Sequence, residues 1–225
     1  MVIASSDDWA TDAEARFLNA AVRLAPALGW NERLVHEAEA EIGLSRAEGE
    51  LLWPKGATDL AALLIRRHDE QTLAALAKID VRQLKIRERI HAAVEARIDA
   101  GMADEAATRA CHRFMAAPSR LPLSLRLGWE TADKLWRWAG DTATDENHYS
   151  KRAILATILA TTLVARMVGG PEQARKHLSG RIDQVMAFEK WKATGAPKPS
   201  EWGKAAAGWL GGLRYGPRRS DQPRA

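Results

Sequence analysis

The stretch NERLVHEAEAEIGLSRAEGELLWP, from Asn31 to Pro54, decides the fold class. Apolar residues recur three and four positions apart on both sides of Gly43, which is typical of two short helices. Gly43 and Leu44 form the expected turn, and Ser45 with Glu48 three residues later has the spacing of a capping box that begins the second helix. Pro54 marks its end. The stretch therefore predicts a helix-turn-helix outline.

The same apolar spacing continues through nearly the whole chain, so we expect an all-α protein of about ten helices. Short segments of Gly, Pro, Asp or Thr separate these helices. The four helices before about residue 79 include the helix-turn-helix outline and are expected to form a small unit of their own. The most apolar helix is expected from about His148 to Met167, in a central position, and the sequence GGP at 169–171 ends it.

The composition agrees with a helical fold. The chain has 225 residues, of which 46% are hydrophobic, enough for a buried core. Its three Phe and two Tyr argue against a sheet-rich protein. The single cysteine, Cys111, has no partner for an intramolecular disulfide, so we expect a buried thiol in a reducing compartment.

Charge is distributed unevenly along the chain. Residues 1–52 contain four Arg against ten Asp or Glu, whereas residues 190–225 contain eight Lys or Arg against two acidic residues. DNA affinity depends largely on cations that meet phosphate, yet the short helix after Ser45 offers Arg46 among Glu48 and Glu50. We therefore expect no nucleic-acid binding, although a ligand-responsive transcriptional regulator is the main alternative function.

The ends and the apolar runs of the chain predict its location. The first residues, MVIASSDDWATDAEARF, show neither an export signal nor the Arg-rich bias of an organellar transit peptide. No stretch approaches the roughly 20 apolar residues that a spanning helix needs. We expect a bacterial cytoplasmic protein that lies against the inner face of the membrane without crossing it.

The last expected helix, after Pro199, is amphipathic. Its apolar residues fall three and four positions apart in one stripe, and four glycines make it weak as an isolated helix. A basic fringe suits an anionic lipid surface. We predict membrane contacts at Trp202, Ala206, Trp209, Leu210 and Leu213. The alternative is a terminal helix that packs on its own core or on a second subunit.

The sequence WRWAGDTATDENHYSKRAIL, from Trp136 to Leu155, and GWNE, from Gly29 to Glu32, resemble one family. This is the ubiquinone (coenzyme Q) biosynthesis lipid-binding accessory protein family, and the resemblance covers roughly Trp9 to Leu213. It implies a TetR-like fold and a homodimer that binds isoprenoid or quinone-precursor lipid without a cofactor. It also implies contact with a membrane surface and delivery of the lipid to the di-iron demethoxyubiquinone hydroxylase.

On this resemblance the hydroxylase is expected to contact the surface around the AGD-to-Tyr motif. The predicted partner-binding residues are Trp136, Trp138, Asp141, Thr144, Asp145, Asn147, His148, Tyr149 and Arg152. Eukaryotic relatives tend to carry aromatic residues on both sides of the motif Asn, where this chain has Glu146 and His148. Without the resemblance, the same segment reads as an ordinary loop between two helices.

The resemblance also divides the chain into three expected parts. These are a helix-turn-helix-like unit (1–79), a helical lipid-binding and dimerisation domain (80–195), and a hinge with the amphipathic helix and basic tail (196–225). Predicted lipid-lining residues are Ile90, Val94, Ile98, Leu125, Leu127, Ile158 and Leu159. Each of these also fits plain core packing.

The sequence shows no catalytic or metal motif. Asp141, Asp145, Glu146 and His148 lack the spacing of three or four residues that puts two ligands on one helical face, so no metal is expected. No phosphate-binding Gly-rich loop is present. We therefore expect a protein that is not an enzyme.

Overall fold

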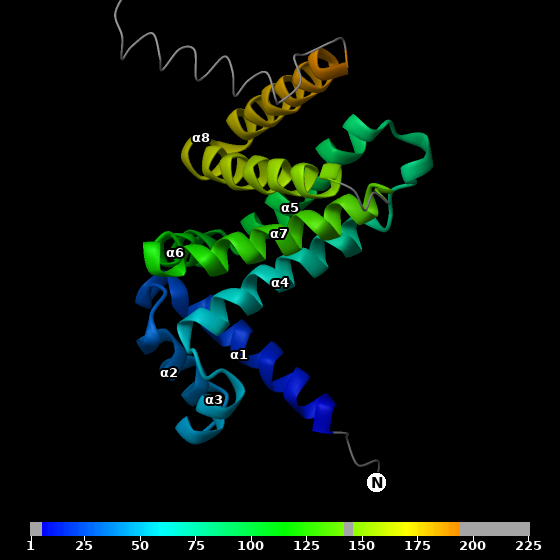
Figure 1. Ribbon diagram of the computed structural model, residues 1–225. Helices are drawn as coiled ribbons and strands as arrows, with labels where there is room; N and C mark the ends of the chain where they lie inside the picture. The colour runs from blue at the N-terminus through cyan, green and yellow to red at the C-terminus, as the bar shows by residue number, and fades with distance from the viewer. Residues whose placement is uncertain (1–5, 142–145, 194–225) are drawn as a thin grey trace, which may run out of the picture. The chain divides into compact units, whose positions relative to one another are not determined.

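The computed structural model describes residues 6–141 and 146–193, and within these ranges it consists of eight α-helices and no strand (Figure 1). The prediction of an all-α protein is confirmed. In chain order the helices are α1 (Ser6–Leu28), α2 (Glu32–Glu41), α3 (Arg46–Leu52), α4 (Ala57–Leu76), α5 (Ile86–Ala103), α6 (Glu105–Met115), α7 (Leu121–Trp138) and α8 (Glu146–Ala193). Two 3-10 turns, Val81–Gln83 and Pro118–Arg120, precede α5 and α7.

The helix count differs from the expected ten for two reasons. Two expected helices are joined in α8, although Gly170 inside it has φ 78° and ψ −172°, a conformation open to glycine and not helical. The backbone therefore breaks where the GGP sequence predicted. The expected amphipathic helix, with Trp202, Ala206, Trp209, Leu210 and Leu213, lies outside the described residues.

The helix-turn-helix outline forms as the sequence predicts. The Asn31 side chain accepts a hydrogen bond from the Leu34 amide at 3.1 Å and caps α2. Gly43 has φ 77° in the turn, and the Ser45 amide donates to Glu48 at 2.8 Å to complete the capping box of α3. Local sequence therefore sets both helix starts.

Two capping interactions stand before α5. The Asp80 side chain accepts a hydrogen bond from the Arg82 amide at 3.0 Å and holds the 3-10 turn Val81–Gln83. The helix begins at Ile86, after the Lys85 amide donates to Glu88 at 2.7 Å. The capping interaction between Lys85 and Glu88 therefore sets the start of α5.

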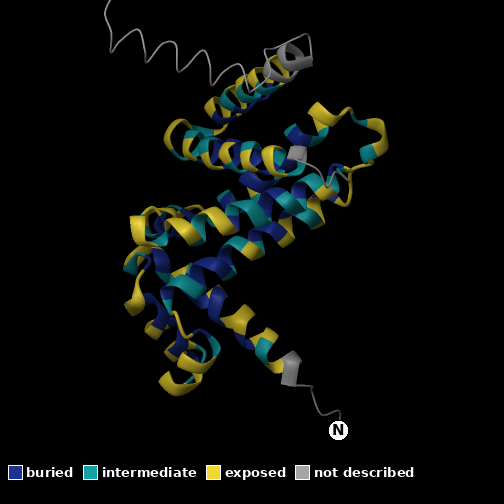
Figure 2. Ribbon diagram, viewed as in Figure 1, coloured by how far each residue is buried: buried dark blue, intermediate teal, exposed yellow. Residues whose placement is uncertain are grey.

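The core joins the helix-turn-helix helices to the longer ones. Phe17 of α1 is fully buried and stacks on Trp53 with ring centroids 3.9 Å apart. Helix α4 packs against α1, α2, α5 and α7, and buried residues run along it (Figure 2). Residues up to Arg181 form one compact unit, and α8 from Ile182 to Ala193 belongs to a second unit. The predicted boundaries after residues 79 and 195 stay predictions.

Helix α8 corrects the expectation that no segment is long and apolar enough to cross a membrane. Among the described residues, its segment His148–Ala187 has the length and composition of a spanning helix. Threonines in this segment bond back to the helix backbone, as Thr157 does to the Ala153 carbonyl at 2.9 Å. A third of the most apolar stretch is buried, and the core helix of a soluble protein passes the same test. Length and composition alone therefore do not place α8 in a membrane.

Candidate functional site

The loop between α7 and α8 begins at a glycine turn. Gly140 has φ 90°, and the Asp141 amide donates to the Trp136 carbonyl at 3.0 Å, which closes the end of α7. Arg89 in the first turn of α5 donates from Nη1 to the Ala139 carbonyl at 2.8 Å. The AGD sequence therefore has a defined shape, and Asp141 is its last described residue before position 146.

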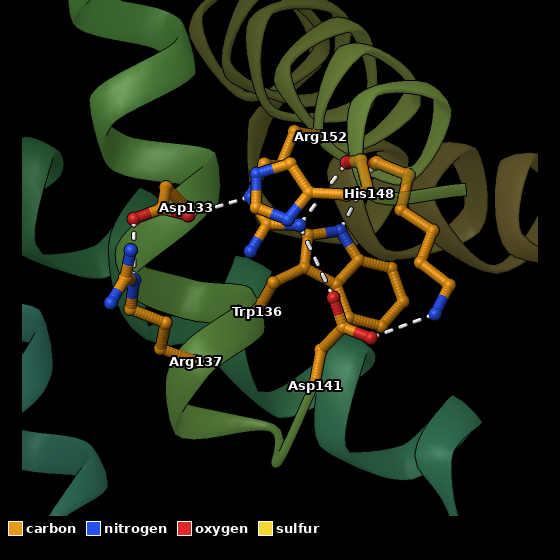
Figure 3. Close-up of polar contacts among 7 residues, drawn as sticks. Asp133, Trp136, Arg137, Asp141, His148 and Arg152 are labelled. Carbon is orange, nitrogen blue, oxygen red and sulfur yellow. Dashed lines mark hydrogen bonds and ion pairs between the residues drawn. The ribbon is translucent and has the colours of Figure 1, made fainter. Parts of the chain in front are cut away.

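The buried side chain of Arg152 in α8 connects this loop to α7 and α8. Its Nε donates to Asp133 Oδ1 of α7 at 2.6 Å. Its Nη1 lies 3.2 Å from Asp141 Oδ2 and 3.1 Å from the His148 carbonyl oxygen. Figure 3 shows the guanidinium between the two carboxylates. One buried cation therefore ties the last turns of α7, the loop and the first turns of α8 together.

Lys151 of α8 makes a second ion pair with the loop, and its side chain is more exposed than that of Arg152. Its Nζ lies 2.7 Å from Asp141 Oδ1 and 5.5 Å from the centre of the Trp136 ring. The Trp136 indole Nε1 donates to the Lys151 carbonyl at 3.0 Å (Figure 3). We name these residues the loop cluster: Asp133, Trp136, Asp141, Lys151 and Arg152.

Both carboxylates of the loop cluster are held in their charged form. Partial burial raises the pKa of Asp141, but the hydrogen bonds and charges of Lys151 and Arg152 outweigh it and bring this pKa below its usual value. The pKa of Asp133 is lowered in the same way, because Arg152 and Arg137 outweigh burial. The cluster is therefore a preformed ionic framework.

Aromatic rings lie next to the loop cluster. Tyr149 is 65% exposed, and its ring centre lies 5.8 Å from that of Trp129 and 5.2 Å from that of His148. Partly exposed aromatic side chains next to a fixed polar network are typical anchors of protein interfaces. We call these three residues the aromatic patch.

The predicted partner-binding residues fall into three groups. His148 and Tyr149 lie in the aromatic patch, while Trp136, Asp141 and Arg152 form the framework beneath it. Trp138 is half-buried and donates from Nε1 to the Leu76 carbonyl at 3.3 Å, so it packs toward the end of α4. Thr144 and Asp145, and the side chain of Asn147, lie outside the described residues.

Sequence reasoning missed several members of this site. Asp133 and Lys151 belong to the loop cluster, and Trp129 completes the aromatic patch. The spacing of four between Asp133 and Arg137 was a readable ion-pair signal on α7. Nothing local, in contrast, pointed to the contact between Asp133 and Arg152, which are 19 positions apart.

An apolar cavity of about 300 Å³ lies between α7 and α8, with α5 and α6 contributing to its walls. Leu127 and Thr131 are buried in it, whereas Leu121 and Ala160 are exposed, so it opens to solvent. The full lining is Ile65, Arg97, Ile98, Cys111, His112, Met115, Ala116, Leu121, Ser124, Leu127, Gly128, Thr131, Ala156, Leu159, Ala160 and Leu163.

Three predicted lipid-lining residues border this cavity, namely Ile98, Leu127 and Leu159. Ile90, Val94 and Ile158 are buried but do not line it, and Leu125 is 65% exposed. Among the described residues, no group of three or more His, Cys, Asp or Glu side chains is placed to hold a metal ion.

Comparison with known proteins points to one family. Residues 121–189, which contain α7 and most of α8, match the COQ9 family model. The "Ubiquinone biosynthesis protein COQ9, mitochondrial" of Homo sapiens is 30% identical over 182 residues, which are 76% of this chain and 57% of the human protein. The protein of the same name from Bos taurus is 29% identical over 76% of this chain and 56% of its own length. That from Xenopus tropicalis is 27% identical over 77% and 57%.

The names of these relatives overturn one prediction. A bacterial cytoplasmic location was expected from the first residues of the chain, but the human, cattle and frog proteins are all named as mitochondrial. That expectation is wrong on this comparison. The chain spans 57% of the human protein's length, so its first residues were no basis for assigning a location.

The family match falls on the part of the chain that carries the site. Helices α7 and α8 and the loop between them supply the loop cluster, and the two helices supply more than half of the cavity lining. The likeness to the human relative extends over 76% of the chain. The resemblance predicted from the Trp136 to Leu155 sequence is therefore confirmed: the chain is similar to COQ9 proteins in α7 and α8 and over three quarters of its own length.

Proposed function

We propose that this protein is a non-catalytic lipid-binding accessory protein of ubiquinone biosynthesis. It holds an isoprenoid or quinone-precursor lipid in the cavity between α7 and α8 and presents it to the demethoxyubiquinone hydroxylase. The observation that carries the proposal is that the same two helices form the apolar cavity and the loop cluster with its aromatic patch.

The cavity has the size and lining of a site for part of a lipid. Its volume of about 300 Å³ lies at the lower end of the roughly 300–1,000 Å³ of small-ligand pockets, which is room for a head group or a short section of tail. Small residues line part of it, where Gly128 of α7 faces Ala156 of α8 and a Cβ at Gly128 would lie 3.8 Å from that of Ala156. Pockets of this size and apolar character are the usual sites for small ligands.

The aromatic patch supports the docking part of the proposal. Tyr149 is exposed, and the ion pairs beneath it fix the backbone from which it projects. A surface that is already ordered loses less conformational entropy when a partner binds. The hydroxylase is therefore proposed to contact Trp129, His148 and Tyr149 and the loop between Asp141 and His148.

The side chains of the site favour a non-catalytic role. Burial raises the pKa of the Cys111 thiol to about 12, so it stays protonated and is a poor nucleophile. The carboxylates of the loop cluster are engaged in ion pairs with Lys151 and Arg152. A membrane contact through Trp202 to Leu213 and a homodimer also remain part of this proposal.

The alternative of a TetR-like transcriptional regulator is disfavoured by the charges on α3. Glu48 accepts hydrogen bonds from the Ser45 amide and hydroxyl, and Arg46 Nε lies 2.9 Å from Glu50 Oε1. The cation that would have to meet a DNA phosphate is therefore next to a carboxylate. Specific, salt-sensitive binding to an operator sequence would favour the regulator.

Lipid binding is tested by mass spectrometry of an organic extract from the natively purified chain. We expect co-purifying isoprenoid lipid in the wild type and much less in Ala160→Phe, which places a ring at the cavity mouth. The matched control is Val168→Phe on the same helix, 81% exposed and outside the lining. A clean wild-type extract would count against the carrier role.

Docking is tested separately with purified hydroxylase and immobilised accessory protein. Tyr149→Ala is expected to weaken binding at least about tenfold, as interface anchors commonly do. Leu51→Ala on α3, which is 81% exposed and lies far from Tyr149 in the sequence, is the control and should bind as the wild type. Equal binding by both variants would remove the aromatic patch from the interface.

A further inference from the structure

The cavity between α7 and α8 contains a buried cation that the proposed function does not use. Arg97 of α5 is 9% exposed and belongs to the cavity lining. Apolar tails need no cation, and burying a guanidinium is costly unless it is paired and hydrogen-bonded. Its presence at the inner wall of an otherwise apolar cavity therefore requires an explanation.

The partners of Arg97 leave part of its guanidinium unused. Its Nε donates to Asp69 Oδ1 at 2.9 Å, and among the described residues no hydrogen bond from Nη1 or Nη2 is seen. Asp69 is also shared, because Lys134 Nζ lies 3.0 Å from its Oδ2 and Thr131 Oγ1 donates to the same carboxylate. Two cations face one anion, so this group carries one excess positive charge.

The other polar side chains of the cavity lining are uncharged at neutral pH. Thr131 Oγ1 bonds to Asp69, and Ser124 Oγ bonds to the Met115 carbonyl at 3.0 Å. Cys111 keeps a neutral thiol. Burial and the charge of Arg97 lower the pKa of His112 in the lining to about 4, so this side chain is neutral at neutral pH. Arg97 is the lining residue with a permanent charge, and its Nη groups are charged donors for a ligand.

Burial gives the cavity a direction. Arg97, Leu127 and Thr131 are buried, whereas Leu121 is 54% exposed and Ala160 is also exposed. Arg97 is thus one of the buried lining residues, whereas apolar residues such as Leu121 and Ala160 line the part that opens to solvent. A ligand that satisfies both ends has a polar head inside and an apolar chain that leaves between α7 and α8.

We infer that Arg97 binds the acidic head group of an amphiphile, so that the cavity selects an anionic lipid inserted head first. The inference rests on the proposed lipid-binding function and names the chemical class of its ligand. A carboxylate or a phosphate matches the guanidinium, since each offers two acceptor oxygens to its parallel N–H groups. One excess positive charge balances a head with a single negative charge.

The inference is tested with three amphiphiles of equal chain length, dodecanoate, dodecyl phosphate and dodecanol, each used below its aggregation concentration. Binding to the full chain is measured by calorimetry. We expect at least one of the two anions to bind about tenfold or more tightly than dodecanol, because hydrogen bonds to a charged group are stronger than neutral ones. The better of the two anions then identifies the head as carboxylate or phosphate.

Two variants separate the head site from the rest of the cavity. Arg97→Met is expected to remove the preference for the anion, whereas Arg97→Lys keeps the charge and part of the preference. Arg66→Met is the matched control, because it removes a half-exposed cation that pairs with Glu130 outside the cavity lining and should leave the preference unchanged. Should Arg97→Met fail to fold, the wild-type preference and Arg97→Lys decide the matter.

The outcomes distinguish the inference from the function on which it rests. Equal binding of dodecanol and both anions overturns head-first selection and leaves the lipid carrier intact. An unchanged preference in folded Arg97→Met overturns the role of Arg97. Failure of all three amphiphiles to bind overturns both the inference and the carrier.

Discussion

Arg152 Nε lies 2.6 Å from Asp133 Oδ1, and this contact joins α8 to α7 across the loop that carries the family motif. The same guanidinium reaches Asp141 at the other end of the cluster. Because the Arg152 side chain is 2% exposed, it acts beneath the surface that is proposed to meet a partner. The shape of that surface therefore depends on a residue that a partner does not touch directly.

Replacing Arg152 is expected to destabilise the protein strongly. Arg152→Met leaves Asp133 and Asp141 without their buried cation, and breaking a buried ion pair on one side costs about 3–5 kcal/mol. Urea unfolding measures the change. Arg137→Met is the control, because its side chain is 71% exposed and its pair with Asp133 should contribute at most about 1 kcal/mol. Equal effects of the two substitutions would contradict the role of Arg152 as the buried tie.

Local signals predicted the helices and their caps, but not the contacts between them. The capping box at Ser45 and Glu48 and the break at Gly170 follow from residues within a few positions of each other. Arg152 was placed on the partner surface because it lies within the motif, and its burial depends on Asp133, 19 positions earlier. Such a pairing is fixed by how α7 packs on α8.

The cavity shows the same limit. The lining was predicted from apolar periodicity. This periodicity indicates that Ile158 and Leu159 face the interior, but it does not indicate which of them borders a cavity. In the structure Leu159 lines the cavity, while Ile158 is buried elsewhere. Small residues such as Gly128 and Ala156 also line the cavity, and a search for large apolar residues does not find them.

The stability of the fold is expected to fall between pH 6.5 and about pH 4. Burial, and then the charge of Arg97, lower the pKa of His68 from 6.5 to about 4, although Asp104 acts in the opposite direction. In this pH range His68 therefore binds a proton in the unfolded chain but not in the folded protein. The free energy of unfolding is highest above pH 6.5 and falls as the pH is lowered toward 4. The loss is on the order of 3 kcal/mol for this shift. His68→Gln should show a shallower decline in the free energy of unfolding, and parallel pH profiles would exclude His68 as the cause.

Cys111 is expected to be inert in the folded protein. Cys111 is 2% exposed, and burial raises the pKa of its thiol to about 12, so almost no thiolate exists at neutral pH. A disulfide reagent that absorbs on reaction should label the chain in urea and leave it unlabelled in native buffer for hours. Labelling at similar rates in both solutions would show that this part of α6 opens readily.

Substitution of Gly49 tests how tightly α3 packs on α2 in the helix-turn-helix. Gly49 of α3 lies against the Glu39 carboxylate, and a Cβ there would overlap with that group. Glu39 is not free to move away, because it is 5% exposed and Trp53 Nε1 donates to it at 2.6 Å. Gly49→Ala gains up to about 1 kcal/mol of helix propensity but suffers about 1–3 kcal/mol of overpacking, so we expect a net loss of stability.

Gly180 of α8 is the matched control for this substitution. It is exposed, and a Cβ at this position meets no atom within 4 Å. Gly180→Ala should therefore stabilise the protein by up to about 1 kcal/mol through helix propensity alone. Thermal unfolding of the two variants gives opposite signs if the contact between Gly49 and Glu39 restricts the packing of α3 on α2. A stabilised Gly49→Ala would instead mean that the Glu39 side chain moves aside without losing its bond to Trp53.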